Sequence, residues 1–191
     1  MTVLAEDVAA FDQRGCLSPS ALYVVGGGRE AALAALDRLA EALEARARRF
    51  GFAPRIPPGA ASAIVSLRAI HAMDSSGRRR ARFSPGLPGW TLLFDEDGES
   101  LHPTPGWQTL FVHPIGNWDA LPTAAAELTR GGGLQAIGIA PDESACPPGV
   151  MAALRGLGLS RVCALEQMQS PPLDWAHDGN PFFPWRVSIA K

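Results

Sequence analysis

Apolar residues recur every three or four positions in several parts of the chain, and this spacing predicts amphipathic helices. The clearest pattern runs over residues 29–50, where leucine and alanine alternate with Glu and Arg on the opposite side. The expected helices cover residues 4–13, 29–50, 61–73, 121–129 and 150–157. The first of them should end near Gly15, because glycine commonly follows the last turn of a helix.

Short runs rich in β-branched, aromatic and other apolar residues predict strands. These runs cover residues 21–25, 90–94, 109–112, 134–139 and 161–165. We expect the second and third of them at a sheet edge, since an acidic turn at 95–98 and a proline-rich connection separate them. Residues 95–97 are typical of a solvated hairpin tip rather than of paired catalytic carboxylates. The segment 74–89, with its Ser, Gly, Arg and Pro, predicts an exposed loop.

Helices and strands alternate in the C-terminal part, which predicts an α/β fold with a mostly parallel sheet covered by helices. We expect the regular elements to form one domain over residues 1–168. Residues 169–191 are rich in Pro and Trp and predict an irregular arm that packs on this domain or on a partner.

Composition narrows the function classes. With 47% hydrophobic and 19% charged residues and a net charge of −2, the 191-residue chain is typical of a globular protein and not of a nucleic-acid binder. The basic run 78–82 is interpreted as a solvated loop. No signal peptide or membrane span is expected, and three cysteines without a Cys-x-x-Cys spacing indicate a cytoplasmic protein without disulfides. The scattered histidines predict no metal site.

Cys16 has the most reactive setting of the three cysteines. Small and polar neighbours predict a turn with exposed backbone N–H groups, and Arg14 could favour the thiolate. A structural role is the alternative, because cysteine is among the most buried residue types. Cys163, within an apolar strand, fits that structural role, and Cys146 is expected to be a loop thiol without function.

Two further features could carry chemistry. Residues 26–31 satisfy the dinucleotide pattern Gly-x-Gly-x-x-Ala after a strand and before a helix. No second strand with an acidic end follows at the required distance, which favours a simple turn and helix start. His177 is flanked by acidic residues and a tryptophan, so it could be oriented for proton transfer, although a satisfied histidine is the alternative.

Two runs together resemble a known family. Residues 11–19 read Phe-Asp-Gln-Arg-Gly-Cys-Leu-Ser-Pro, and residues 168–179 read Met-Gln-Ser-Pro-Pro-Leu-Asp-Trp-Ala-His-Asp-Gly. Both resemble motifs of the acyl-CoA reductases that include the fatty-acid reductase of bacterial luminescence, a branch of the aldehyde dehydrogenase superfamily. The resemblance covers nearly the whole chain, but only the C-terminal catalytic part of such an enzyme. It implies an aldehyde dehydrogenase-like catalytic domain.

The resemblance implies a reaction in which the Cys16 thiolate attacks a fatty acyl thioester, of coenzyme A or of a carrier protein. The Cys16 backbone N–H would stabilise the oxyanion, and Gln13, Arg14, Ser18 and His177 are candidates for supporting roles. NADPH would reduce the acyl-enzyme to the aldehyde. In the family its binding domain precedes the cysteine, and we expect that domain to be absent from this chain.

An alternative from another class is a non-catalytic interaction or oligomerisation module, or a truncated remnant without its nucleotide-binding domain. Such a chain would pair with a separate nucleotide-binding chain or with itself. The irregular arm at 169–191 would suit either kind of docking.

Overall fold

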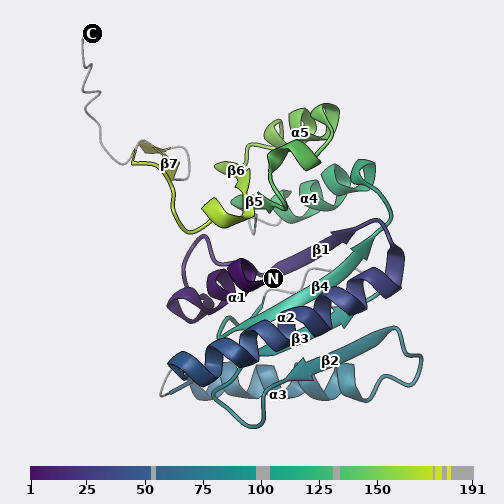
Figure 1. Ribbon diagram of the computed structural model, residues 1–191, viewed down its shortest axis with the longest axis vertical. Helices are drawn as coiled ribbons and strands as arrows, with labels where there is room; N and C mark the ends of the chain where they lie inside the picture. Colours follow the sequence, from purple (N-terminus) through teal and green to yellow (C-terminus); the bar gives the residue numbers. More distant parts are fainter. Residues whose placement is uncertain (53–54, 98–103, 131–133, 174, 178–179, 182–191) are drawn as a thin grey trace.

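The strands of this computed structural model form two sheets, in which most neighbouring strands run parallel, and a small antiparallel hairpin, as Figure 1 shows. The structure describes residues 1–52, 55–97, 104–130, 134–173, 175–177 and 180–181. Its helices are α1 (Thr2–Ala9), η1 (Ala10–Gln13), α2 (Gly28–Phe50), α3 (Pro58–Ala72), η2 (Trp118–Ala120), α4 (Leu121–Arg130), η3 (Glu143–Ala145), α5 (Pro148–Arg155) and η4 (Leu165–Gln167). Its strands are β1 (Ala21–Val25), β2 (Arg79–Phe83), β3 (Thr91–Asp95), β4 (Thr109–Ile115), β5 (Ala136–Ile139), β6 (Arg161–Ala164), β7 (Ala176–His177) and β8 (Asn180–Pro181).

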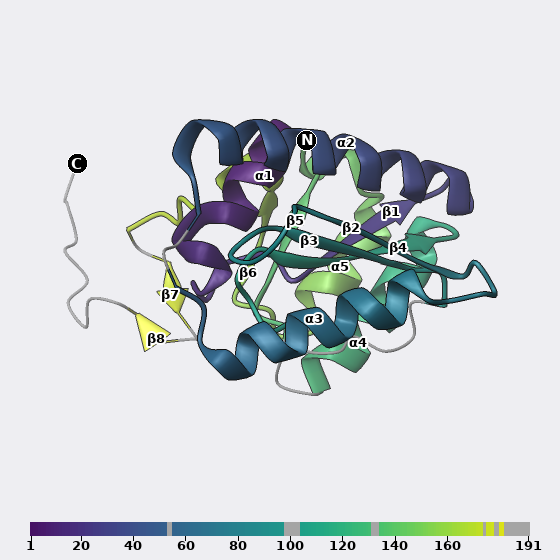
Figure 2. The ribbon, with the colours of Figure 1, turned by 90° about the horizontal axis from the view of Figure 1, so that it is seen from below.

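The larger sheet has the order β1-β4-β3-β2, with α2 on one face and α3 on the other, as Figure 2 shows. β1, β4 and β3 run parallel, whereas β2 is antiparallel to β3. The apolar stripe of α2, with Leu36, Leu39 and Leu43, is almost fully buried against Phe94 and Leu110 of the central strands. This burial explains why the helical spacing was so regular in the sequence.

A second, smaller sheet pairs β5 with β6 in parallel and packs with α4 and α5 around its own apolar cluster. β1 joins the two parts of the molecule. Its alternate side chains face opposite sides, so Leu22 and Val24 pack against the first cluster while Tyr23 and Val25 pack against the second. The predicted α/β class with a mostly parallel sheet is therefore confirmed, although the strands divide between two sheets.

The strands expected at an edge lie instead in the middle of the larger sheet. β3 is buried along its whole length and pairs with both β4 and β2. The edge strand is β2, which falls inside the segment 74–89 that was predicted to be a loop. Its arginines conceal the strand pattern, because a charged, solvent-facing edge strand lacks the hydrophobic alternation on which the prediction depends.

The basic run 78–82 is therefore part of a sheet edge and not a loop. Arg79 pairs with Asp95 at 3.2 Å, and Arg82 pairs with Asp37 of α2 at 2.8 Å. Arg78 pairs with Asp97. These ion pairs attach the edge strand to its neighbours.

One smaller prediction was wrong and one was incomplete. The acidic residues 95–97 do not form a hairpin tip, because β3 and β4 run parallel, and Asp95 is buried at 8% exposure. Cys146 lies in the loop between η3 and α5, as expected, but it is a buried member of the second apolar cluster. In both cases tertiary packing covers residues whose local sequence is typical of an exposed turn.

Candidate active site

Cys16 lies at an exposed corner of a tight turn that follows α1 and η1. The Ser18 backbone N–H donates to the Gly15 carbonyl at 3.0 Å, which closes a four-residue turn with Cys16 at its second position. The Ser18 hydroxyl in turn accepts a hydrogen bond from the Gly15 N–H at 3.2 Å. Within the described residues the Cys16 backbone N–H has no acceptor, so it is available to a developing oxyanion.

The other two thiols are in a different environment. Cys146 and Cys163 are 4% and 5% exposed, and burial raises the pKa of both thiols above the ordinary value. The Arg161 guanidinium donates to the Cys163 sulfur at 3.2 Å and partly opposes this effect. Cys16 is therefore the cysteine that a substrate can reach.

The backbone just before Cys16 is unusual. Phe11, Asp12 and Gln13 have φ values of 52°, 53° and 58°, in the left-handed region that costs an L-residue about 1–2 kcal/mol. Trp107 and Gln108, just before β4, share this conformation with φ values of 54° and 58°. The Trp107 N–H donates to the Asp12 carbonyl at 3.0 Å, so the two left-handed segments lie against each other.

The Gln13 side chain fixes the base of the Cys16 turn. Its Nε2 donates to the carbonyls of Pro19 at 2.6 Å and Thr109 at 2.7 Å. Its Oε1 accepts a hydrogen bond from the Thr109 N–H at 2.6 Å. A residue proposed from the sequence as a supporting group is thus part of the scaffold beneath Cys16.

Arg14 lies over the ring of Trp107, with its guanidinium carbon 4.8 Å from the ring centroid. This cation–π contact joins the Cys16 turn to the segment that precedes β4. No pattern in the sequence indicates Trp107 as a partner of the turn. The expected influence of Arg14 on the Cys16 thiolate stays a prediction.

The two sequence motifs meet at the Cys16 turn. The Gln169 amide donates to the Leu17 carbonyl at 3.1 Å, although the two residues are 152 positions apart. Met168, next to it, is buried beside Gly138 of β5. The start of the C-terminal motif therefore stabilises the turn that carries the cysteine. The spacing of residues along the chain could not predict this contact between Gln169 and Leu17.

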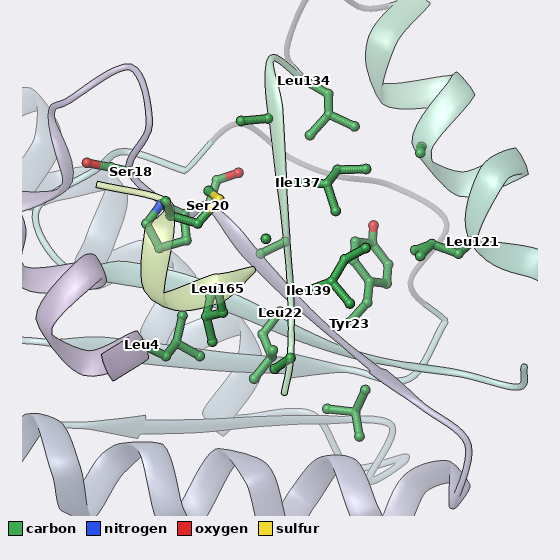
Figure 3. Close-up of a pocket in the computed structure, with 18 of the residues that line it drawn as sticks. Leu4, Ser18, Ser20, Leu22, Tyr23, Leu121, Leu134, Ile137, Ile139 and Leu165 are labelled. Atoms are coloured by element: carbon green, nitrogen blue, oxygen red, sulfur yellow. The ribbon is translucent and has the colours of Figure 1, made fainter. Parts of the chain in front are cut away.

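A cavity of about 390 Å³ opens beside Cys16, between β1 and β5. Figure 3 shows its mainly apolar lining, with Leu22 and Tyr23 from one strand and Ile137 and Ile139 from the other. Its lining runs from Ala21 to Val25 and from Ala136 to Ile139, the full length of both strands. Each of these strands lies at the edge of its sheet. The volume is within the usual range of small-molecule sites.

His177 lies in β7, which pairs with β8 in a hairpin apart from the main body in Figure 1. Its role in proton transfer is still a prediction. Within the arm, the Trp175 indole donates to the Ser160 carbonyl at 2.9 Å and holds this segment on β6.

The glycine run before α2 has the order of elements that a nucleotide site requires. β1, Gly26 to Gly28 and α2 form the required strand, turn and helix. The Arg29 side chain at the helix start is bound to Glu96 at 2.7 Å and to the Gly77 carbonyl at 2.5 Å. The parallel neighbour of β1 is β4, which ends in Ile115 rather than in an acidic residue. This segment does not fit a dinucleotide fingerprint.

Metal sites and membrane spans are absent from the part of the chain that the structure describes. There, no three His, Cys, Asp or Glu side chains gather as a metal site would require. No helix among those residues has the length and apolar character needed to span a bilayer.

The family model described as acyl-CoA reductase (LuxC) matches residues 1–181, which include the Cys16 turn and the C-terminal motif. No curated protein matches the chain.

Proposed function

The chain belongs to the acyl-CoA reductase (LuxC) family, and we propose that Cys16 accepts the acyl group of a fatty acyl thioester in its reaction. The observation that carries this proposal is the exposed thiol of Cys16 on a turn held by both family-like motifs. Nucleophilic cysteines need access to substrate and nearby N–H donors, and this turn supplies both.

In the proposed step the Cys16 thiolate attacks the acyl carbon of the thioester. A new bond forms between Sγ and that carbon, and the bond from the carbon to the sulfur of coenzyme A, or of a carrier protein, breaks. The leaving thiolate takes up a proton from solvent. Negative charge on the acyl oxygen during the attack would be stabilised by the Cys16 N–H, which has no acceptor among the described residues.

The acyl group would have apolar surface within reach, because Cys16 itself lines the cavity between β1 and β5. Tyr23 lies in that lining, and burial together with nearby Glu127 raises the pKa of its hydroxyl to about 12. The Tyr23 hydroxyl is therefore uncharged at neutral pH, while Arg38 adds one charged side chain to the lining.

The reductive half of the reaction needs a hydride donor. We propose NADPH for this role, bound by a nucleotide-binding domain or chain beyond the residues described, since the glycine run before α2 does not fit such a cofactor. The chain would then be a catalytic part that acts together with that domain in a cytoplasmic enzyme with an aldehyde dehydrogenase-like architecture.

Release of free coenzyme A tests the acyl transfer. Incubated with palmitoyl-CoA and no reductant, the wild-type protein should release coenzyme A in a burst close to the protein concentration. Cys16→Ala should remove the burst, whereas Cys163→Ala, the matched control at a buried thiol, should retain it. An equal burst from the wild type and from Cys16→Ala would contradict the proposal.

The cavity favours a second candidate function. It lies between the edge strands β1 and β5 and follows both over their full length, so it could receive an additional apolar strand that pairs with the two sheets. The chain would then act as an interaction module that binds a nucleotide-binding chain or a second copy of itself. In this case an inserted strand, and not the acyl group, would occupy the space between the sheets.

Hydrogen exchange separates the two candidates. If a second copy supplies the strand, amides of β1 and β5 should become more protected as protein concentration rises, together with an increase in sedimenting mass. If the cavity serves the acyl group, their protection should be independent of concentration and should rise when palmitoyl-CoA is added.

A further inference from the structure

The loop that carries Cys16 is closed at its base by one side chain. The chain enters this loop at Gln13 and leaves it at Pro19, just before β1. Gln13 is 6% exposed, and its amide bonds both to Pro19 at the far end of the loop and to Thr109 at the start of β4. One carboxamide therefore ties both ends of the loop to the central sheet.

The three hydrogen bonds need a glutamine. Two carbonyl oxygens face Nε2 and require two N–H donors, which a glutamate cannot supply. The Thr109 N–H, which also donates to the Gly106 carbonyl at 3.1 Å, donates to the amide oxygen at the same time. An asparagine has the right groups on a side chain that is one methylene shorter, so it cannot span the same distances.

The hydrogen bonds of Gln13 also stabilise the left-handed backbone at residues 11–13. Such a conformation persists only where the surroundings impose it, and it is concentrated at functional sites. The Gln13 amide and the bond from Trp107 to Asp12 hold this segment in place, together with the bond from the Arg14 N–H to the Phe11 carbonyl at 3.1 Å.

We propose that Gln13 is a positioning residue that sets the direction of the Cys16 sulfur relative to the bound thioester. The inference rests on the proposed acyl transfer to Cys16. Attack on a thioester carbon requires a narrow range of distance and angle, whereas alkylation by a small, freely diffusing reagent does not. Loss of the Gln13 bonds should therefore slow acyl transfer much more than it slows alkylation.

The test compares Gln13→Glu and Gln13→Asn with Gln167→Glu, a control that makes the same charge change at an exposed glutamine. Two rates are measured for each protein: coenzyme A release from palmitoyl-CoA and alkylation of Cys16 by iodoacetamide. Both Gln13 variants should lose tenfold or more in the first rate and stay within threefold of the wild type in the second. The control should match the wild type in both.

Equal losses in the two rates would overturn the proposal, because they would show a change in thiol exposure or ionisation rather than in position. Unchanged acyl transfer in both Gln13 variants would overturn it as well. If Gln13→Glu does not fold, the neutral Gln13→Asn variant gives the same comparison.

Hydrogen exchange distinguishes failure of this inference from failure of the proposed function. The N–H groups of Ser18 and Thr109 should exchange at least tenfold faster in the Gln13 variants, while those of α2 stay unchanged. If the wild type transfers no acyl group at all, the proposed function fails and the exchange rates still decide the inference. Unchanged exchange at Ser18 and Thr109 would refute the role of Gln13 in holding the loop.

Discussion

Two buried histidines lie close to the central strand β4. His113 is 1% exposed and His71 is 5% exposed, and each has a ring Nε2 without a partner among the described residues. In each ring Nδ1 donates to a backbone carbonyl, of Asp95 at 3.0 Å and of Leu67 at 2.9 Å. Burial lowers the pKa of both histidines below the ordinary value, so both are neutral in the folded protein at pH 7.

This arrangement predicts a loss of stability in mild acid. Below about pH 6.5 a histidine in the unfolded chain binds a proton, whereas the buried histidine does not, so unfolding becomes more favourable as pH falls. Each histidine should contribute up to about 1.4 kcal/mol per pH unit in that range. Urea midpoints measured between pH 8 and pH 5 should fall less steeply for His113→Gln than for the wild type. Parallel pH profiles for the two proteins would contradict the assignment.

The contribution of Asp7, in α1, to the stability of the fold depends on pH in the opposite direction. It is 6% exposed, its Oδ2 has no partner among the described residues, and burial, with a smaller effect of Glu6, raises its pKa to about 6. The raised pKa means that the folded state favours the protonated acid. This group therefore costs no stability below about pH 4, and its cost grows as pH rises toward 6.

Asp7→Asn should consequently stabilise the protein at pH 8 by about 1 to 2 kcal/mol, because the buried charge is removed. At pH 4 the gain should vanish. Glu41→Gln, the same kind of change at an exposed carboxylate, is the matched control and should not stabilise. Thermal unfolding at the two pH values measures both effects, and an equal gain at both would contradict the raised pKa.

The sequence identified the exposed cysteine better than the contacts that hold its turn. Cys16 stood out because the motif and the local turn agree, and Gln13 and Ser18 belong to the same run. Gln169 lay within the second motif, but its bond to Leu17 depends on tertiary folding. The left-handed backbone at residues 11–13 has no signal in the sequence, since none of these residues is a glycine.

At the level of elements, β5 and η4 meet at Gly138. A Cβ at this position would lie 2.7 Å from Met168 Cγ, 2.8 Å from its sulfur and 3.2 Å from Leu165. Met168 precedes Gln169, so this close packing supports the bond from Gln169 to the Cys16 turn. The smaller sheet thereby influences the candidate site on the larger one.

Gly138→Ala should destabilise the protein by about 1 to 3 kcal/mol, as expected for extra volume in a packed core. It should also slow acyl transfer to Cys16 through displacement of Met168 and Gln169. Gly149→Ala, in α5, adds a methyl group where no atom lies within 4 Å and should be neutral or slightly stabilising. Urea unfolding of the wild type and of both variants measures the stability, and coenzyme A release measures the acyl transfer. A Gly138→Ala variant as stable as the control would contradict the packing argument.

Most helices were predictable because each has one apolar face. The long helix α2 agrees with the sequence within one residue, and α3 begins earlier, at Pro58. The edge strand β2 could not be predicted, because its partners are charged residues distant in the chain, such as Asp37. The short α1 was expected to run to residue 13, but the left-handed turn ends it at Ala9.

At the scale of the whole molecule, two sheets with separate apolar clusters meet along β1, and Cys16 lies in the chain that enters β1. The α/β class followed from the alternation of elements. The division into two sheets did not, because strand patterns contain no information about which edges remain unpaired. The cavity between β1 and β5 is a consequence of that division.

The central claim is that Cys16 is the acyl acceptor, and mapping of the acylated residue tests it most directly. The protein is incubated with an equimolar amount of palmitoyl-CoA, digested at acidic pH to preserve thioesters, and its peptides are analysed by mass spectrometry. We predict one palmitoyl group, on the peptide that contains Cys16, and none on the peptides with Cys146 or Cys163. An unmodified Cys16 peptide, or acylation that persists in Cys16→Ala, would contradict the account.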